Sequence, residues 1–240
     1  MESSDNQMIN AQIPKIIHQV WGNRNGVAPD KILFEFAESW KDENPEWEYR
    51  FWNYEAIDQF LSDYYPEFIE KYNCFRYDVQ RWDAIRYLIL LKFGGVYADM
   101  DYECLEPLDW LCGNKSCCLG LEPTEHCRIF NKSLLVGNAF MAVVPQHPFL
   151  KAIINEISNN HSNHMDKLHY VLETTGPVMM SNLYESYLEK NDIWLIPSEL
   201  TSPLSKNEVI SIINGRSTDV IAEKIEKAYA VHYFFGSWIN

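Results

Sequence analysis

Acidic side chains recur at every second position in the segment FGGVYADMDYE, residues 93–103. Its two glycines suit the end of a helix, and the residues that follow them favour a β-strand. Because side chains alternate between the faces of a strand, we expect Asp99, Asp101 and Glu103 to share one face. The two aspartates would then lie roughly 7 Å apart. One carboxylate could hold a divalent cation while the other accepts hydrogen bonds from ligand hydroxyls.

Carboxylates at the end of a buried strand need a compensating charge. A bound cation would supply that charge, and a set of oxygen ligands favours Mn²⁺ or Mg²⁺. The same alternation of acids also occurs in solvated edge strands, where it discourages pairing with another chain. The spacing of the acids is compatible with both interpretations.

The element that must position these acids is a helix predicted over residues 77–93. Its apolar residues recur at helical spacing, and it is apolar nearly all round from Tyr87 onward, which indicates burial. Asp83 and Arg86 lie three residues apart and therefore on one face. Such a pair is ordinarily a surface ion pair. On a buried helix we expect it to face a cleft, where Arg86 could bind anionic or hydroxyl oxygens and Asp83 sugar hydroxyls.

The other predicted elements alternate along the chain, which favours an α/β fold. We expect strands at residues 13–22, 47–53, 117–123, 138–144, 193–200 and 229–235, and helices at 30–40, 54–60, 64–72, 148–157 and 178–188. Trp21, at the end of the first strand, could stack on a nucleotide base or pack in the core. We interpret His18, in the same strand, as structural. Glu122, after the strand at 117–123, could face either an acceptor or the solvent.

The composition restricts the class of protein. The chain has 240 residues, 47% of them hydrophobic, and no repeat or linker, so we expect one domain over residues 1–240 with residues 1–12 disordered. A net charge of −14 without a basic stripe argues against nucleic-acid binding. No apolar run reaches the roughly 18 residues of a membrane span. The first residues lack the pattern of a secretory signal, so we expect a cytoplasmic protein.

Thiols and imidazoles offer two groups that resemble zinc sites. They are Cys112, Cys117, Cys118 and Cys127 with His126, and His161, His164 and His169. The first group contains no C-x-x-C pair, and without a signal peptide reduced thiols are the expected state. The second group has no glutamate partner, and we interpret it as a polar loop that leads into a helix.

Several segments, in order along the chain, resemble glycosyltransferase family 32, whose members carry a DXD sugar-binding region. The family includes the fungal initiating α-1,6-mannosyltransferase and bacterial capsular polysaccharide enzymes. The matching segments are IPKIIHQVWG (13–22), NPEWEYRFWN (44–53), DAIRYLILLKFGGVYADMDYECLEPLD (83–109), NAFMAVVPQHPFL (138–150), TTGP (174–177) and HYFFGSW (232–238). A lone D-x-D would be weak evidence, whereas this ordered set spans nearly the whole chain.

The resemblance implies a GT-A (Rossmann-like) fold, in which helices flank a mostly parallel sheet and the nucleotide binds at the carboxyl ends of the strands. It implies a metal-dependent, retaining enzyme that moves a hexose from a UDP- or GDP-hexose to a saccharide or lipid-linked acceptor. Surface or capsular polysaccharide synthesis would be its role. Peripheral association with the inner face of the membrane is compatible with such acceptors.

The matching positions also imply roles for individual residues. Asp101 would bind Mn²⁺ or Mg²⁺ directly, and Asp99 would bind the ribose and the donor sugar. Asp83 and Arg86 would hold the sugar, and Asn138 would lie near the reacting centre.

Residues 229–240 would form a tail that closes over the donor and excludes water. In this tail His232 would contact the metal, Ser237 would contact a phosphate and Trp238 would cover the donor. Trp21 would also belong to the donor site, as a residue on which the base could stack.

Two other classes of function are compatible with the same residues. One is a catalytically silent protein that binds nucleotide sugars or carbohydrates on this fold. The other is a phosphohydrolase with Asp99 as nucleophile. Such enzymes usually continue as D-x-D-G-T, whereas Tyr102 and Glu103 follow here, which disfavours the hydrolase.

Overall fold

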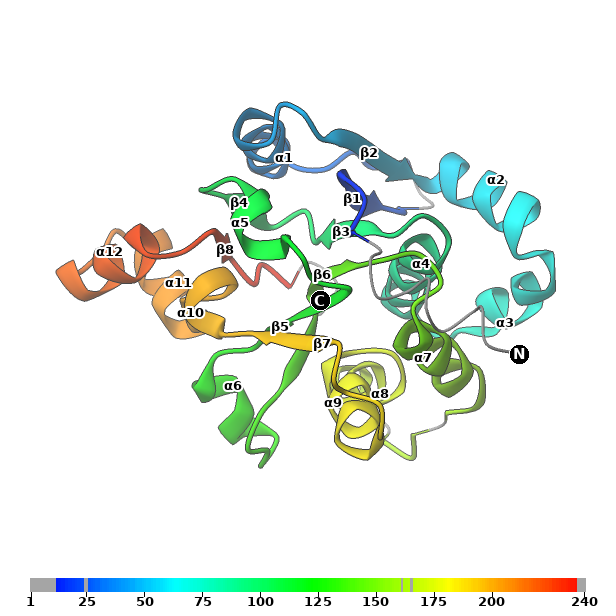
Figure 1. Ribbon diagram of the computed structural model, residues 1–240. Helices are drawn as coiled ribbons and strands as arrows, with labels where there is room; N and C mark the ends of the chain where they lie inside the picture. The colour runs from blue at the N-terminus through cyan, green and yellow to red at the C-terminus, as the bar shows by residue number, and fades with distance from the viewer. Residues whose placement is uncertain (1–11, 24–25, 161, 165, 237–240) are drawn as a thin grey trace.

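The computed structural model describes residues 12–23, 26–160, 162–164 and 166–236. In this part of the chain six strands form a mixed sheet in the order β2-β1-β3-β6-β5-β7 (Figure 1). Their bounds are β1 Ile16–Trp21, β2 Glu48–Asn53, β3 Gly95–Ala98, β5 Cys117–Leu121, β6 Val136–Val143 and β7 Ile193–Ile196. Strand β6 runs antiparallel to β3 and β5, and the other neighbouring pairs are parallel. The predicted α/β class with a mostly parallel sheet is confirmed.

A second, two-stranded antiparallel sheet joins β4 (Tyr102–Cys104) to β8 (Ala230–His232). The helical elements are α1 Lys31–Glu43, α2 Tyr54–Tyr64, η2 Pro66–Phe68, α3 Ile69–Cys74, α4 Asp78–Phe93, α5 Leu108–Cys112, α6 Thr124–Ile129, α7 Pro148–Asn159, α8 Lys167–Thr174, α9 Pro177–Ser186, α10 Ser198–Thr201, α11 Lys206–Ile213 and α12 Asp219–Glu226.

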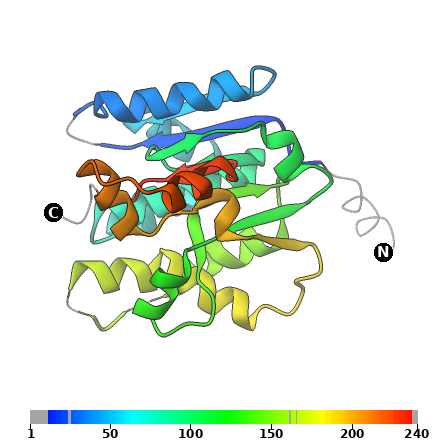
Figure 2. The same cartoon turned by 90° about the vertical axis from the view of Figure 1, so that its left-hand side faces the viewer.

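Helices cover both faces of the six-stranded sheet, with α1 on one side and α7, α8 and α9 on the other (Figure 2). The side chains of β6 alternate accordingly. Phe140 and Ala142 pack in a core cluster with Trp40 of α1, whereas Met141 and Val143 pack in the cluster that contains α4 and α7. A strand buried on both faces must be apolar throughout, which explains the run NAFMAVV.

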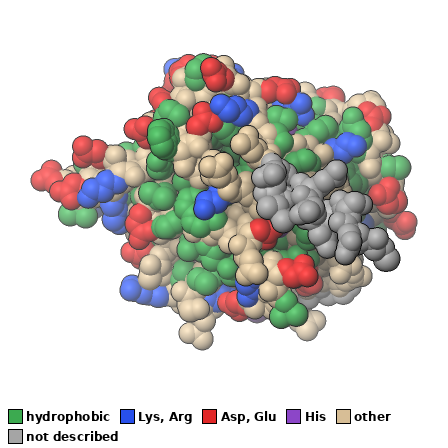
Figure 3. Space-filling model, viewed as in Figure 1, with side chains coloured by type: hydrophobic (Ala, Val, Ile, Leu, Met, Phe, Trp, Pro, Cys, Tyr) green, Lys and Arg blue, Asp and Glu red, His purple; other side chains and the backbone are tan. Residues whose placement is uncertain are grey.

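On the face of the molecule seen in Figure 3, the acidic and basic side chains of the described residues are scattered among apolar and neutral ones. They do not gather into a basic stripe on this face. Among the described residues, no helix combines the length and apolar character that a membrane crossing requires.

Helix α4 lies where the apolar spacing predicts it, and both of its ends have identifiable causes. The side chain of Gln80 accepts a hydrogen bond from the Tyr77 amide before the first turn (3.1 Å). At the other end Gly94 and Gly95 have φ of 64° and 97°. A Cβ on Gly95 would lie 2.5 Å from the carbonyl oxygen of Ile16 in the neighbouring strand. The two glycines therefore end the helix with positive φ, as predicted, and Gly95 also lets β3 approach β1 closely.

The strand predicted to continue through residue 103 is interrupted by a turn, and that prediction was wrong. Strand β3 ends at Ala98, and the Tyr102 amide donates to the Asp99 carbonyl (3.1 Å). After the turn β4 leaves the main sheet to pair with β8. Glu103 does not share a face with the two aspartates, because its carboxylate accepts a hydrogen bond from the Tyr233 hydroxyl (2.6 Å).

Two strands predicted late in the chain are shorter than expected. The strand predicted at residues 193–200 ends at Ile196, and Pro197 then begins the turn into α10. The strand predicted at 229–235 is limited to β8, after which Phe234 has a positive φ of 47° that no strand can continue.

The surroundings of His18 in β1 agree with the structural role expected for it. It is fully buried; its Nε2 is 2.9 Å from the Gly94 carbonyl and its Nδ1 accepts from the Trp52 indole (3.1 Å). Both ring nitrogens are therefore used by a neutral imidazole. Burial lowers the pKa of His18 to about 4.

We expect this histidine to make stability depend on pH. Because its pKa is lower in the folded than in the unfolded state, the unfolded chain binds the extra proton. Stability is therefore retained above about pH 6.5 and lost as the pH falls towards 4, by about 3 kcal/mol. Urea unfolding at several pH values measures this change in the free energy of unfolding. His18→Gln should remove this part of the pH dependence, whereas His169→Gln, at an exposed histidine, should leave it; equal pH dependence in all three chains would contradict the expectation.

The expected reduced state of the thiols agrees with the structure. All six cysteines lie among the described residues and are free; Cys74 is exposed and the other five are buried. The histidines His164 and His169 pair with the acids Glu173 and Asp166 on the surface. His161, the third histidine of that group, lies outside the described residues.

Candidate active site

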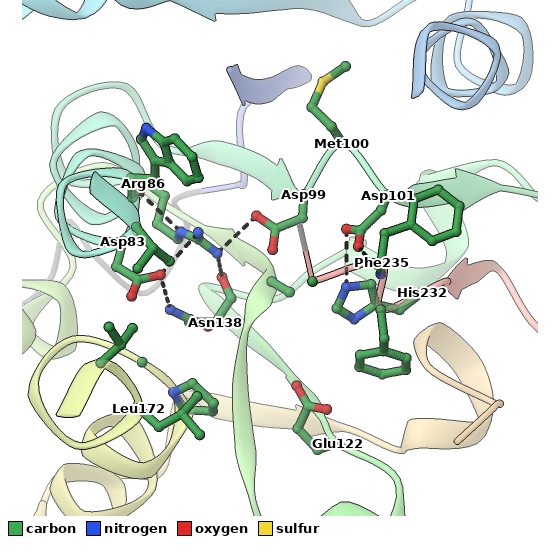
Figure 4. Close-up of a pocket in the computed structure, with 18 of the residues that line it drawn as sticks. Asp83, Arg86, Asp99, Met100, Asp101, Glu122, Asn138, Leu172, His232 and Phe235 are labelled. Carbon is green, nitrogen blue, oxygen red and sulfur yellow. Dashed lines mark hydrogen bonds and ion pairs between the residues drawn. The ribbon is translucent and has the colours of Figure 1, made fainter. Parts of the chain in front are cut away.

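A cavity of about 460 Å³ opens where the carboxyl ends of β1, β3 and β5 meet (Figure 4). The reversed direction of β6 brings its beginning, with Asn138 and Ala139, to the same edge of the sheet. Helices α4, α8 and α9 and the segment after β8 complete the wall. The lining includes each predicted site residue that the structure describes: Trp21, Asp83, Arg86, Asp99, Asp101, Asn138 and His232.

Asp83, Arg86 and Asn138 form one buried network on the α4 side of the cavity. The Arg86 guanidinium lies 3.0 Å from an Asp83 carboxylate oxygen and donates to the Asn138 carbonyl (3.0 Å). The Asn138 side chain donates to Asp83 (2.8 Å). All three side chains are at least 94% buried. The expectation that the Asp83–Arg86 pair faces a cleft is confirmed.

Two further residues hold this network in place, and the sequence analysis did not single them out. The Thr175 hydroxyl donates to the second Asp83 oxygen (2.7 Å). The Tyr87 hydroxyl accepts from Asn138 and donates to the Thr175 carbonyl. Thr175 belongs to the TTGP turn, and this match was a signal that could have identified it. Every oxygen of the buried Asp83 carboxylate thereby has a partner, which its burial requires.

Arg86 also connects this network to the aspartate turn. Its Nη1 lies 2.9 Å from Asp99 Oδ1, which accepts a second hydrogen bond from the Tyr97 hydroxyl (2.6 Å). The guanidinium lies over the Tyr97 ring, 4.7 Å from its centre. One cation therefore serves two carboxylates, Asp83 and Asp99, and the nearby acids hold the pKa of Arg86 above its ordinary value despite burial.

Asp99, Asp101 and His232 form the group that could hold a cation. One ligand atom from each lies within 4.8 Å of the others. Nε2 of His232 is 3.2 Å from Asp101, and its buried Nδ1 has no hydrogen-bond partner among the described residues. Two carboxylates and an imidazole suit Mn²⁺ or Mg²⁺. The turn, rather than a continuous strand, brings the two aspartates together, so Asp99 is also within reach of a cation.

The charges around this group differ between the two aspartates. Burial raises the pKa of Asp99, although the Arg86 charge opposes it. Burial acts in the same direction on Asp101, but the His232 imidazole and the hydrogen bonds to Asp101 outweigh it, so the pKa of this carboxyl lies below its ordinary value. Burial would lower the pKa of His232, but Asp101 reverses the effect and raises it. Asp101 is thus the more firmly ionised carboxylate.

The segment that follows β8 lies directly over the aspartate turn. The Tyr233 amide donates to the Asp101 carbonyl and the Phe235 amide to its carboxylate (both 2.9 Å). The Phe234 ring contacts His232, with ring centres 3.9 Å apart. The predicted tail residues Ser237 and Trp238 lie outside the described residues.

Two other side chains contribute to the wall. Trp21 is stacked against Trp82, with ring centres 6.5 Å apart, and its indole donates to the Val27 carbonyl (2.7 Å). Glu122, at the end of β5, points into the cavity (Figure 4). Its carboxylate is only 11% exposed and lies 2.9 Å from His126 Nδ1. The expectation of a solvent-facing Glu122 does not fit this position, and contact with an acceptor stays a prediction.

The mixed sheet, the helices on both of its faces and the acid-lined edge correspond to the predicted GT-A fold. The solved structure "PaToxG Glycosyltransferase" shares this fold: it superposes with a TM-score of 0.51 at 16% identity, over 93% of this chain and 90% of its own.

The sequence comparisons define the family. The family described as "Glycosyltransferase sugar-binding region containing DXD motif" matches residues 33–117. Inositol phosphoceramide mannosyltransferase 3 of Schizosaccharomyces pombe is 30% identical over 79% of this chain and 51% of its own length. Mannosyl phosphorylinositol ceramide synthase SUR1 of Saccharomyces cerevisiae is 28% identical over 92% and 55%. The chain spans about half the length of these curated relatives. The matched region and the relatives named as mannosyltransferases support the predicted assignment to glycosyltransferase family 32.

Proposed function

We propose that the chain transfers a mannosyl residue from a nucleoside diphosphate sugar to a hydroxyl of an inositol phosphate lipid, with a divalent cation at Asp101 and His232. The observation that carries the proposal is the joining of two sites in one cavity. A cation-binding group of acids lies beside a buried Asp83–Arg86–Asn138 network suited to sugar hydroxyls.

The roles of the residues follow from their positions. The cation, when bound, would neutralise the charge that develops on the departing diphosphate. Asp99, held by Arg86 and Tyr97, would accept hydrogen bonds from the ribose and the sugar. Asp83 and Asn138 would orient the sugar hydroxyls, and their buried hydrogen bonds would fix that orientation before the donor binds.

At the edges of the site, Trp21 would stack on the nucleotide base, and the segment around Phe235 would exclude water from the reacting centre. Ser237 and Trp238 would extend this cover over the diphosphate. Retention of anomeric configuration is part of the proposal.

The acceptor in this proposal comes from the names of the relatives. Those names describe mannosyl transfer to inositol phosphoceramide, so we place a lipid-linked acceptor ahead of a capsular saccharide. With such an acceptor, the chain would act at a membrane surface. A catalytically silent sugar-nucleotide-binding protein would share the donor site but would transfer nothing.

A thermal-shift panel followed by a transfer assay tests the proposal. We expect GDP-mannose with Mn²⁺ to raise the Tm of the chain by several degrees, because a ligand at about a hundred times its Kd stabilises the folded state by about 2.7 kcal/mol. UDP-glucose and UDP-galactose serve as controls for the base and the sugar, and EDTA as control for the metal. Mannosylated inositol phosphoceramide, detected by mass spectrometry, would complete the proof. Stabilisation without transfer would support the alternative of a catalytically silent binding protein. The absence of both stabilisation and transfer would contradict the proposal.

A further inference from the structure

The cavity has a second wall, which contains none of the residues that the proposed function assigns to the donor. Helices α6 and α8 and the first turn of α11 build this wall. Its apolar members are Ile129, Phe130, Leu168 and Leu172. The Ile129 side chain is 71% exposed at the mouth of the cavity. An exposed isoleucine at a cavity mouth is unfavourable in water and suits an apolar ligand.

The inner end of this wall is polar. The carboxylate of Glu122 points towards the space that Asp99 and His232 also face (Figure 4). Its Oε2 is held by His126, whereas Oε1 has no hydrogen-bond donor among the described residues. The His126 ring is itself fixed: its Nε2 accepts from the Lys206 amide (3.3 Å), and its ring centre lies 4.7 Å from that of Phe234. A nearly buried, oriented carboxylate oxygen without a donor is suited to a ligand hydroxyl.

A positive charge lies on the same wall. Lys206, the first residue of α11, lines the cavity and is exposed. Within the described residues it forms no ion pair, although acids outnumber lysines and arginines by 34 to 20 in the whole chain. An unpaired ammonium at a cavity wall of an acidic protein is complementary to a ligand anion.

We propose that this wall, formed by Glu122, Lys206 and the apolar group around Ile129, is the acceptor subsite. It would take an amphiphile with three parts: a polyol ring, a phosphate and a hydrocarbon chain. The inference rests on the proposed function and assigns its acceptor to particular residues. Glu122 binds a ring hydroxyl through Oε1, Lys206 binds the phosphate and the apolar group contacts the beginning of the hydrocarbon chain.

The order of these groups fixes the direction of the acceptor. The Glu122 side chain is 11% exposed and faces the same space as Asp99 and His232, whereas Ile129 is 71% exposed at the mouth. The polyol therefore enters first, towards the sugar-binding network, and the hydrocarbon remains at the opening. This direction is the one that a head group projecting from a lipid surface requires.

Direct binding of acceptor fragments tests the subsite without any transfer. Dihexanoyl phosphatidylinositol, kept below its micelle concentration, and inositol 1-phosphate are titrated into the chain by calorimetry with Mn²⁺ and GDP present. We expect the lipid to bind more tightly than inositol 1-phosphate. Ile129→Ser should weaken lipid binding about tenfold and leave inositol 1-phosphate unchanged, because it removes only apolar contact. Glu122→Gln and Lys206→Ala should weaken both probes about tenfold.

Matched substitutions outside the wall are the controls. Leu188→Ser changes another exposed apolar side chain (94% exposed), and Glu125→Gln changes an exposed acid of α6. Both should bind the probes as the unchanged chain does. Failure of both probes to bind the unchanged chain, or equal weakening by the wall and control variants, would overturn the subsite. The thermal-shift panel with nucleotide sugars tests the proposed function separately, because it uses neither the lipid nor inositol 1-phosphate.

Discussion

Replacement of Asp101 by asparagine is expected to reduce the transfer rate at least about a thousandfold. The amide keeps the shape of the side chain and can still accept the hydrogen bond of the Phe235 amide. It removes, however, the more firmly ionised carboxylate of the group that would hold the cation. The loss of charge stabilisation in the transition state corresponds to about 4 kcal/mol. kcat/KM at saturating Mn²⁺ and the Mn²⁺ dependence of GDP-mannose binding measure the two consequences.

Glu103→Gln is the matched control for this substitution. Glu103 is an acid of the same segment, two residues further on, but it bonds Tyr233 and does not line the cavity. We expect this variant to keep its Mn²⁺ dependence. An Asp101→Asn chain that folds normally and still responds to Mn²⁺ as the unchanged chain does would rule out Asp101 as a metal ligand.

Replacement of Arg86 by methionine is expected to have the largest effect on stability. The guanidinium is 5% exposed and is the cation nearest to both Asp83 and Asp99. Methionine fills much of the space but leaves two carboxylates without their counter-charge. Removal of one partner from a buried ion pair costs about 3–5 kcal/mol. Urea unfolding gives the free energy of unfolding directly.

Two comparisons separate charge from shape in this prediction. Lys31→Met disrupts an exposed ion pair with Glu35 (lysine side chain 91% exposed) and should cost less than about 1 kcal/mol. Asp83→Asn combined with Arg86→Met should recover part of the loss, because one uncompensated charge disappears with its partner. If the double variant is no more stable than Arg86→Met alone, the cost comes from packing rather than charge.

The sequence predicts those parts of the site that depend on local pattern. Apolar spacing locates α4, and a separation of three residues places Asp83 and Arg86 on one face. The two glycines after the helix lie where their positive φ is needed. These features need no information from distant parts of the chain, so propensity and periodicity are sufficient.

The turn between Asp99 and Asp101 was not predicted, because its cause lies elsewhere in the chain. Residues 102–104 have strand character and continue the alternation, but they pair with β8, about 130 residues later. The same holds for Thr175, whose hydroxyl reaches Asp83 across 92 positions. Local pattern does not specify such long-range pairs, and here they determine how the carboxylates are held.

The unlinked thiols of this fold have a practical consequence. Burial raises the pKa of the Cys104 thiol to about 12, and an enclosed, protonated thiol reacts slowly with alkylating reagents. Cys74 alone of the six is exposed and should be modified at once. The remaining five sample α5, α6, β4 and β5, so their rates of alkylation report how often each of these regions opens. The chain thus contains its own set of probes for local unfolding in these regions.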